Sequence, residues 1–185
     1  MPAIIVLLLG GWLASSFVAC SAPTNNGAAS PESIVAAPPV ELDGSSLPPW
    51  PAPTNVAARV AAAGLDLGPM GMAEHYHPHL RVIINGEEVP VPANIGVDSA
   101  TGAMSALHTH ETDGTIHIEA DRTGEIFTLG QLFVQWGVKL TPTQIGGAQA
   151  KDGQKVLVTS NSAPVSGDPM KLRFEPEQKI VLQLS

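Results

Sequence analysis

The stretch HLRVIINGEEV, residues 79–89, decides the fold of this chain. Leu80, Val82 and Ile84 alternate with their neighbours, which is the period of a strand that buries one face. The dipeptide Asn85-Gly86 follows, and it is a strong signal for a two-residue hairpin turn because both residues tolerate a positive φ. We therefore expect two antiparallel strands joined by a tight turn.

The same alternation returns at residues 155–159 and 179–184, and in the second segment Ile180, Leu182 and Leu184 share one face. Together these segments predict a mainly β fold, sandwich- or barrel-like, with antiparallel hairpins and one or two short helices. Aromatic residues make up only 4% of the chain, so the core must consist mainly of Val, Ile, Leu and Ala. We expect residues 54–185 to form a single β-rich globular domain.

Two segments have helical character instead. Thr128 and Gln131 have the spacing of a capping box, the apolar residues that follow recur at helical intervals, and Gly137 supplies a stop. A short Ala-rich helix over residues 55–63 is also expected, with Thr54 as its N-cap.

The N-terminus has the features of an export signal. Residues 1–19 are largely apolar but too short and too rich in Gly and Ser for a membrane span, which favours a signal peptide. Phe17-Val18-Ala19-Cys20 resembles the lipobox of exported lipoproteins, in which the cysteine is diacylated. Cys20 is the only cysteine, so it forms no disulfide within the chain. We expect lipidation of Cys20; the alternative is an uncleaved apolar anchor.

Residues 20–53 are rich in Pro, Ala and Ser and have almost no hydrophobic periodicity. This composition predicts a disordered, lipid-anchored linker. The expected location is therefore the extracytoplasmic face of the cell membrane, with the membrane as a partner through the lipid anchor.

The charge narrows the choice of partners further. The chain carries 17 acidic and 9 basic residues, a formal net charge of −8. Such a balance disfavours binding to nucleic acid and to anionic lipid head groups. A protein of the cell envelope remains a candidate partner.

The histidines carry the strongest functional signal. All six fall between residues 75 and 117. If Asp113-Gly114 forms a type I′ turn, His110 lies opposite His117 and His108 lies opposite Glu119, all on one face. Opposed side chains have Cβ atoms about 4.5–5.5 Å apart, so these groups can converge on one ion.

A second group of histidines precedes this hairpin. His75, His77 and His79 follow the same period of two, which predicts that they project to one side of an extended segment and complete the site or form another. Imidazole suits both copper and zinc, so the predicted cofactor is a copper or zinc ion. Met70 and Met72 carry thioethers that suit Cu(I), but they are more simply explained as core or loop residues.

These segments resemble a family of uncharacterised exported proteins. The resemblance covers most of the domain, and members of that family have histidine at the positions of His77, His79, His108, His110 and His117. It implies export and a shared site, with no established activity. The matching motifs are His77-Pro78-His79-Leu80, Ile84-Asn85-Gly86, Val91-Pro92-Ala93-Asn94-Ile95-Gly96, Leu107-His108-Thr109-His110, Gly114-Thr115-Ile116-His117-Ile118-Glu119, Phe127-Thr128-Leu129-Gly130-Gln131-Leu132-Phe133 and Trp136-Gly137.

The function that joins these features is transition-metal binding by an extracytoplasmic lipoprotein, for buffering, delivery or sensing. One alternative is a metal-dependent enzyme of the cell envelope, for which Glu111 and Glu119 are candidate bases. Another is a metal-free lipoprotein that binds other proteins. Catalytic residues are not predicted, because nothing in the sequence singles out a substrate or a nucleophile such as Gly-x-Ser-x-Gly.

Overall fold

The fold is known from a computed structural model, which describes residues 40–185. The expected signal peptide, the lipidation site at Cys20 and the first part of the expected linker lie outside the described residues. The described part is mainly β, with mostly antiparallel sheets and two α-helices, as predicted. No helix within residues 40–185 combines the length and apolar character that a membrane crossing requires.

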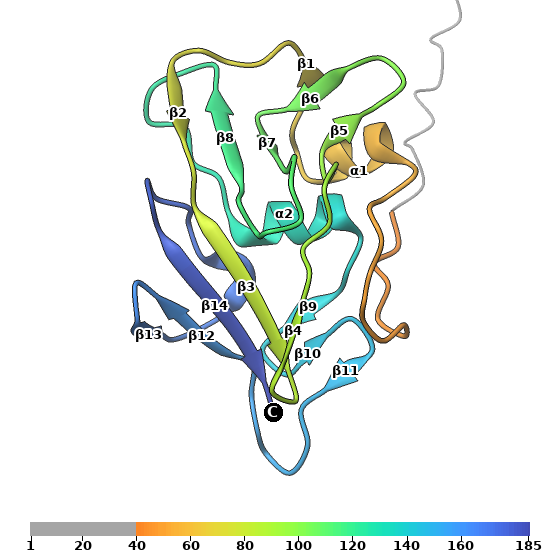
Figure 1. Cartoon of the computed structure of the whole chain (residues 1–185), viewed down its shortest axis with the longest axis vertical. Coiled ribbons are helices and arrows are strands. Elements are labelled where there is room, and N and C mark those ends of the chain that lie inside the picture. Colours follow the sequence, from red (N-terminus) through yellow and green to blue (C-terminus); the bar gives the residue numbers. More distant parts are fainter. Residues whose placement is uncertain (1–39) are drawn as a thin grey trace, which may run out of the picture. The chain divides into compact units, whose positions relative to one another are not determined.

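The largest sheet has five strands in the order β13-β12-β14-β3-β4 (Figure 1). The predicted hairpin is confirmed, since Ile84 pairs with Glu87 across a turn in which Asn85 and Gly86 have φ values of 53° and 85°. Burial along β3 and β14 alternates as expected. The strands are β3 (His79–Ile84), β4 (Glu87–Val89), β12 (Leu157–Ser160), β13 (Ala163–Val165) and β14 (Lys179–Leu184).

The centre of this sheet departs from the expected antiparallel hairpins. β14 pairs with β3 in parallel, from Lys179 opposite His79 to Leu184 opposite Ile84. Parallel neighbours need a long connection, and here it contains most of the remaining domain. Strand alternation predicts which face is buried but not which strand becomes the neighbour.

A second sheet has three strands in the order β2-β8-β7, and each strand carries one histidine. Its strands are β2 (Glu74–Tyr76), β7 (Leu107–His108) and β8 (His117–Ala120). Two further three-stranded sheets are β1 (Leu67–Gly68), β6 (Ala103–Ser105) and β5 (Val97–Asp98), and β11 (Ala148–Gln149), β10 (Gln144–Ile145) and β9 (Leu140–Thr141). A 3₁₀ turn, η1, spans Pro169–Lys171.

Helix α2 (Leu129–Trp136) supports the histidine-bearing sheet from inside the core. The predicted capping box is present, with both Thr128 and Gln131 contributing, and Gly137 ends the helix in the left-handed region. Its apolar face is buried, and Gln135 donates a hydrogen bond of 3.1 Å from Nε2 to the carbonyl oxygen of Leu107 in β7. This hydrogen bond therefore helps to fix the position of β7, the strand that carries His108.

Helix α1 (Val56–Ala62) is shorter than predicted and is capped differently. Asn55, rather than Thr54, occupies the N-cap, and no side chain caps the helix. Arg59 holds the helix in place by donating hydrogen bonds to the carbonyl oxygens of Val134 and Glu41.

The domain begins earlier than the boundary at residue 54 that was predicted. Asp43 forms a parallel bridge with Val138, and Gly147 donates a hydrogen bond to the carbonyl oxygen of Ser46. The Trp50 side chain is buried and makes a T-shaped contact with Trp136 at a ring-centroid distance of 5.7 Å. The described residues before Thr54, predicted to be linker, thus pack against the core.

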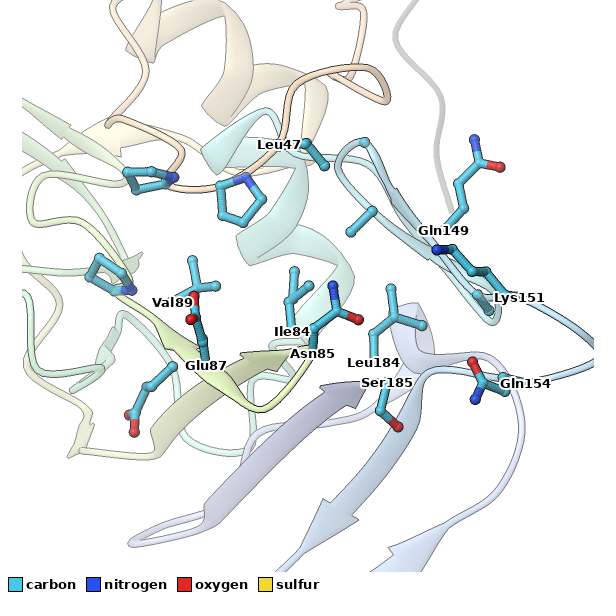
Figure 2. A pocket seen from close by; sticks show the side chains of 17 residues that line it. Leu47, Ile84, Asn85, Glu87, Val89, Gln149, Lys151, Gln154, Leu184 and Ser185 are labelled. Atoms are coloured by element: carbon cyan, nitrogen blue, oxygen red, sulfur yellow. The ribbon is translucent and has the colours of Figure 1, made fainter.

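A cavity of about 930 Å³ lies at the end of β3 that is far from His79 (Figure 2). Apolar side chains of Ile84, Val89 and Leu184 line it, together with Leu47 and the C-terminal Ser185. None of its lining residues is a histidine. The cavity is therefore separate from the histidine side chains described next.

Candidate metal centre

Five of the six histidines gather on one face of the β2-β8-β7 sheet. β8 is the middle strand, and it pairs His117 with His108 of β7 on one side and Glu119 with His75 of β2 on the other. We call His75, His77, His108, His110 and His117 the histidine cluster. Its members come from residues 75–77 and 108–117, and the pairing of β8 with both β2 and β7 brings these two segments together.

The register of the hairpin differs from the prediction by two residues. His108, rather than His110, lies opposite His117. Asp113-Gly114 does not form the two-residue turn, because the Asp113 carboxylate accepts a hydrogen bond from the Thr115 amide and the Gly114 carbonyl accepts one from the Leu80 amide. The first bond is local to a longer loop, and the second ties this loop to β3. A shift of two residues preserves the face, so the histidines still converge.

Two histidine triads could each hold a metal ion. The His75 triad contains His75, His77 and His117, and the His108 triad contains His108, His110 and His117. Within each triad the ligand atoms lie within 4.8 Å of one another. The Nε2 atoms are 3.0 Å apart both in the His75–His77 pair and in the His108–His110 pair. Nitrogens around a tetrahedral zinc are about 3.3 Å apart, so each pair is close to the ligating separation.

His108 is held in a ligand-ready orientation. Its side chain is fully buried, and Nδ1 lies 2.8 Å from the carbonyl oxygen of Ser105. A carbonyl only accepts, so Nδ1 carries the proton and Nε2 presents its lone pair to His110. Burial lowers the pKa of His108 to about 4, which keeps the ring neutral near pH 7. Metal-bound histidines are commonly fixed in this way.

His77 also has its pKa lowered, first by burial and then by the neighbouring imidazoles of His117 and His75. Its ring contacts that of His117 edge to face at a centroid distance of 4.7 Å. The neutral form is the one that binds metal, so crowding of these imidazoles favours ligation over protonation.

Two carboxylates border the cluster. Glu119 Oε1 lies 3.5 Å from His75 Nε2, while Oε2 is buried and has no hydrogen-bond partner among the described residues. Glu111 Oε2 lies 3.3 Å from His117 Nε2, and its side chain is half-exposed. A buried carboxylate oxygen without a partner is costly unless a cation or water compensates it. Glu119 therefore borders the cluster, but it lies opposite His75 and not opposite His108 as predicted. Glu111 was expected only as a candidate catalytic base.

His79 does not join the cluster, contrary to the expected continuation of the period of two. The main chain passes from one sheet to the other at Pro78, whose carbonyl accepts from the Ile116 amide, while the His79 amide donates to Gln178. His79 therefore begins β3, and its side chain lies near Gly114.

The main-chain carbonyl oxygen of Ser105 orients His108, and nothing in the sequence predicted this contact.

Met70 and Met72 lie in the loop before β2. Their side chains are 49% and 96% exposed, so they are loop residues and not part of the core.

The buried His108 predicts an acid-sensitive domain. In the metal-free protein the unfolded chain takes up a proton near pH 6.5, whereas folded His108 does so only near pH 4. Between these two pH values protonation favours the unfolded chain. The free energy of unfolding should therefore fall by about 3 kcal/mol as the pH is lowered through this window. Urea denaturation at several pH values measures this loss. His108→Gln should flatten the dependence and His79→Gln should not; equal slopes in all three proteins would contradict the expectation.

Comparison with protein-family models, curated proteins and solved structures gave no match to this chain. Its function is therefore inferred from the geometry of the histidine cluster.

Proposed function

We propose that the protein is an extracytoplasmic lipoprotein that binds a transition-metal ion, copper or zinc, for buffering, delivery or sensing. The observation that supports it most is the convergence of five imidazoles, one of them buried and oriented by a main-chain carbonyl. Buried neutral imidazoles need partners, and a metal ion satisfies several of their lone pairs at once.

The ligand types favour these metals over calcium or magnesium, which prefer oxygen ligands. Imidazole suits zinc, copper, nickel and iron, and the formal charge of −8 does not oppose cation binding. The anchor remains an expectation from Cys20, as do the membrane location and an envelope protein as recipient of the ion.

The direct test is metal binding by the full chain, purified free of metal. Titration with Zn²⁺, Cu²⁺ and Cu⁺ against a competing chelator, together with mass spectrometry of the native protein, should show near-stoichiometric binding of copper or zinc. The double variant His108→Ala/His110→Ala should bind on the order of 100-fold more weakly, because loss of even an orienting partner costs about 10- to 100-fold. His79→Ala is the matched control. Absence of tight binding for every ion would refute the proposal.

A metal-dependent enzyme is the second candidate, and one observation favours it. His75 has a side chain that is 57% exposed, so an ion held by its triad would be open to water. Three protein ligands with an open position are typical of catalytic zinc, and Glu111 lies beside the cluster as a candidate base. An exchangeable water on the bound ion would support this alternative, whereas a sphere filled by protein ligands would favour storage or transfer.

A further inference from the structure

We infer that the histidine cluster holds one ion in two overlapping positions, with His117 as the ligand common to both. This inference rests on the proposed metal binding. The His108 triad is the resting position, and the His75 triad is the position through which the ion is exchanged with a soluble chelate or a partner protein.

The sharing of His117 is the first step. Each side chain offers one ligand atom, and His117 belongs to both triads. Binding two ions at once would require His117 to ligate through both nitrogens after losing its remaining proton. The two triads therefore compete for a single ion.

The surrounding charge also matches one divalent ion. The imidazoles are neutral ligands, and the carboxylates within 4 Å of them, among the described residues, are Glu111 and Glu119. Two negative charges balance one dication. A second dication next to the first would be repelled without further compensation.

The two triads differ in how firmly their rings are held. The main-chain oxygen of Ser105 orients the buried His108 ring, which also stacks on His117 at a centroid distance of 5.3 Å. Within residues 40–185, the rings of His75 and His77 form no hydrogen bond to the main chain. A preorganised ligand set loses less entropy on binding, so the His108 triad should hold the ion more tightly.

The His75 triad has the better access. The His75 side chain is 57% exposed, whereas His108 is fully buried. The Glu119 carboxylate next to His75 attracts a cation to this side, and its Oε2, which has no hydrogen-bond partner within residues 40–185, can coordinate the ion. His110 is exposed, so the resting position also has one side chain that can move away.

Transfer between the positions is then an exchange of ligands. Bonds from the ion to His75 and His77 break as bonds to His108 and His110 form, while the bond to His117 persists. Oxidation state and proton count do not change in this step. The ion thus moves inward or outward without becoming free in solution.

Two matched double variants of the full chain test this, with Zn²⁺ and Cu²⁺ as probes. The wild type should bind one ion per chain. His75→Ala/His77→Ala should lose less affinity than His108→Ala/His110→Ala, and it should exchange the ion with a chelator about tenfold more slowly in both directions, which corresponds to about 1.4 kcal/mol in the barrier. His108→Ala/His110→Ala should lose affinity and exchange quickly. Stopped-flow kinetics and equilibrium competition separate the two effects.

Three results would overturn the inference while leaving metal binding intact: two ions per wild-type chain, equal affinity losses in the two double variants, or unchanged exchange rates in His75→Ala/His77→Ala. Wild-type protein that binds no ion would instead refute the proposed function itself. His110→Ala alone is included because this exposed side chain can be removed without opening the core. It should weaken binding and speed release, and unchanged binding would count against the His108 triad.

Discussion

Replacing His117 with alanine is expected to weaken binding of copper or zinc by on the order of 100-fold or more, the largest effect of any single histidine. His117 is the only residue that belongs to both triads, so its loss leaves two isolated histidine pairs. Loss of His75 or His110, in contrast, leaves one complete triad.

A chelator competition titration measures this effect, with His75→Ala as the comparison and His79→Ala as the control outside the cluster. The fold should survive, because the His117 side chain is 16% exposed and its strand is held by main-chain pairing to both neighbours. Equal weakening by His117→Ala and His75→Ala would show that His117 has no special place.

Gly114→Ala is expected to destabilise the domain by about 3 kcal/mol. Gly114 has a φ of 89°, and a Cβ added there would clash with the carbonyl oxygen of Leu80. β3 cannot retreat easily, because β14 and β4 flank it. The clash would also strain the hydrogen bond from the Leu80 amide to the Gly114 carbonyl.

Gly124→Ala is the matched control. Gly124 has a φ of 78°, but a Cβ there would meet nothing within 4 Å. Its cost should be only that of the left-handed backbone, about 1 kcal/mol. Urea denaturation of both variants compares them, and equal losses would mean that the contact with Leu80 is unimportant.

Features set by local physics could be predicted from the sequence. The turn at Asn85-Gly86 and the capping box of Thr128 and Gln131 depend on a few neighbouring residues, and the structure has both. The alternation in β3 and β14 likewise identified the buried faces.

Features set by distant contacts could not. The predicted register of the histidine hairpin was wrong because the Gly114 carbonyl accepts a hydrogen bond from Leu80 in β3. The residues of the hairpin alone give no sign of this contact. His79 was misplaced because the period of two was extended across Pro78, where the chain changes sheets. Trp50 was the one sign that the end of the Pro-rich segment packs, since a large aromatic side chain gains much from burial.

The candidate site was predicted better than its register. Five of the six histidines share a face because a two-residue shift conserves the side on which each side chain lies. The cross-strand partners differ from those predicted. The membership of His117 in both triads was not predicted, because it depends on β8 having β2 on one side and β7 on the other.

The parallel pairing of β3 with β14 also has a consequence for how the domain forms. β14 lies between β3 and β12, and it comes last in sequence among the described strands. The central contacts of the largest sheet therefore join residues as far apart in the sequence as His79 and Lys179. Such long-range contacts slow folding. We therefore expect the centre of the largest sheet to form late in folding, after the local turns and helices.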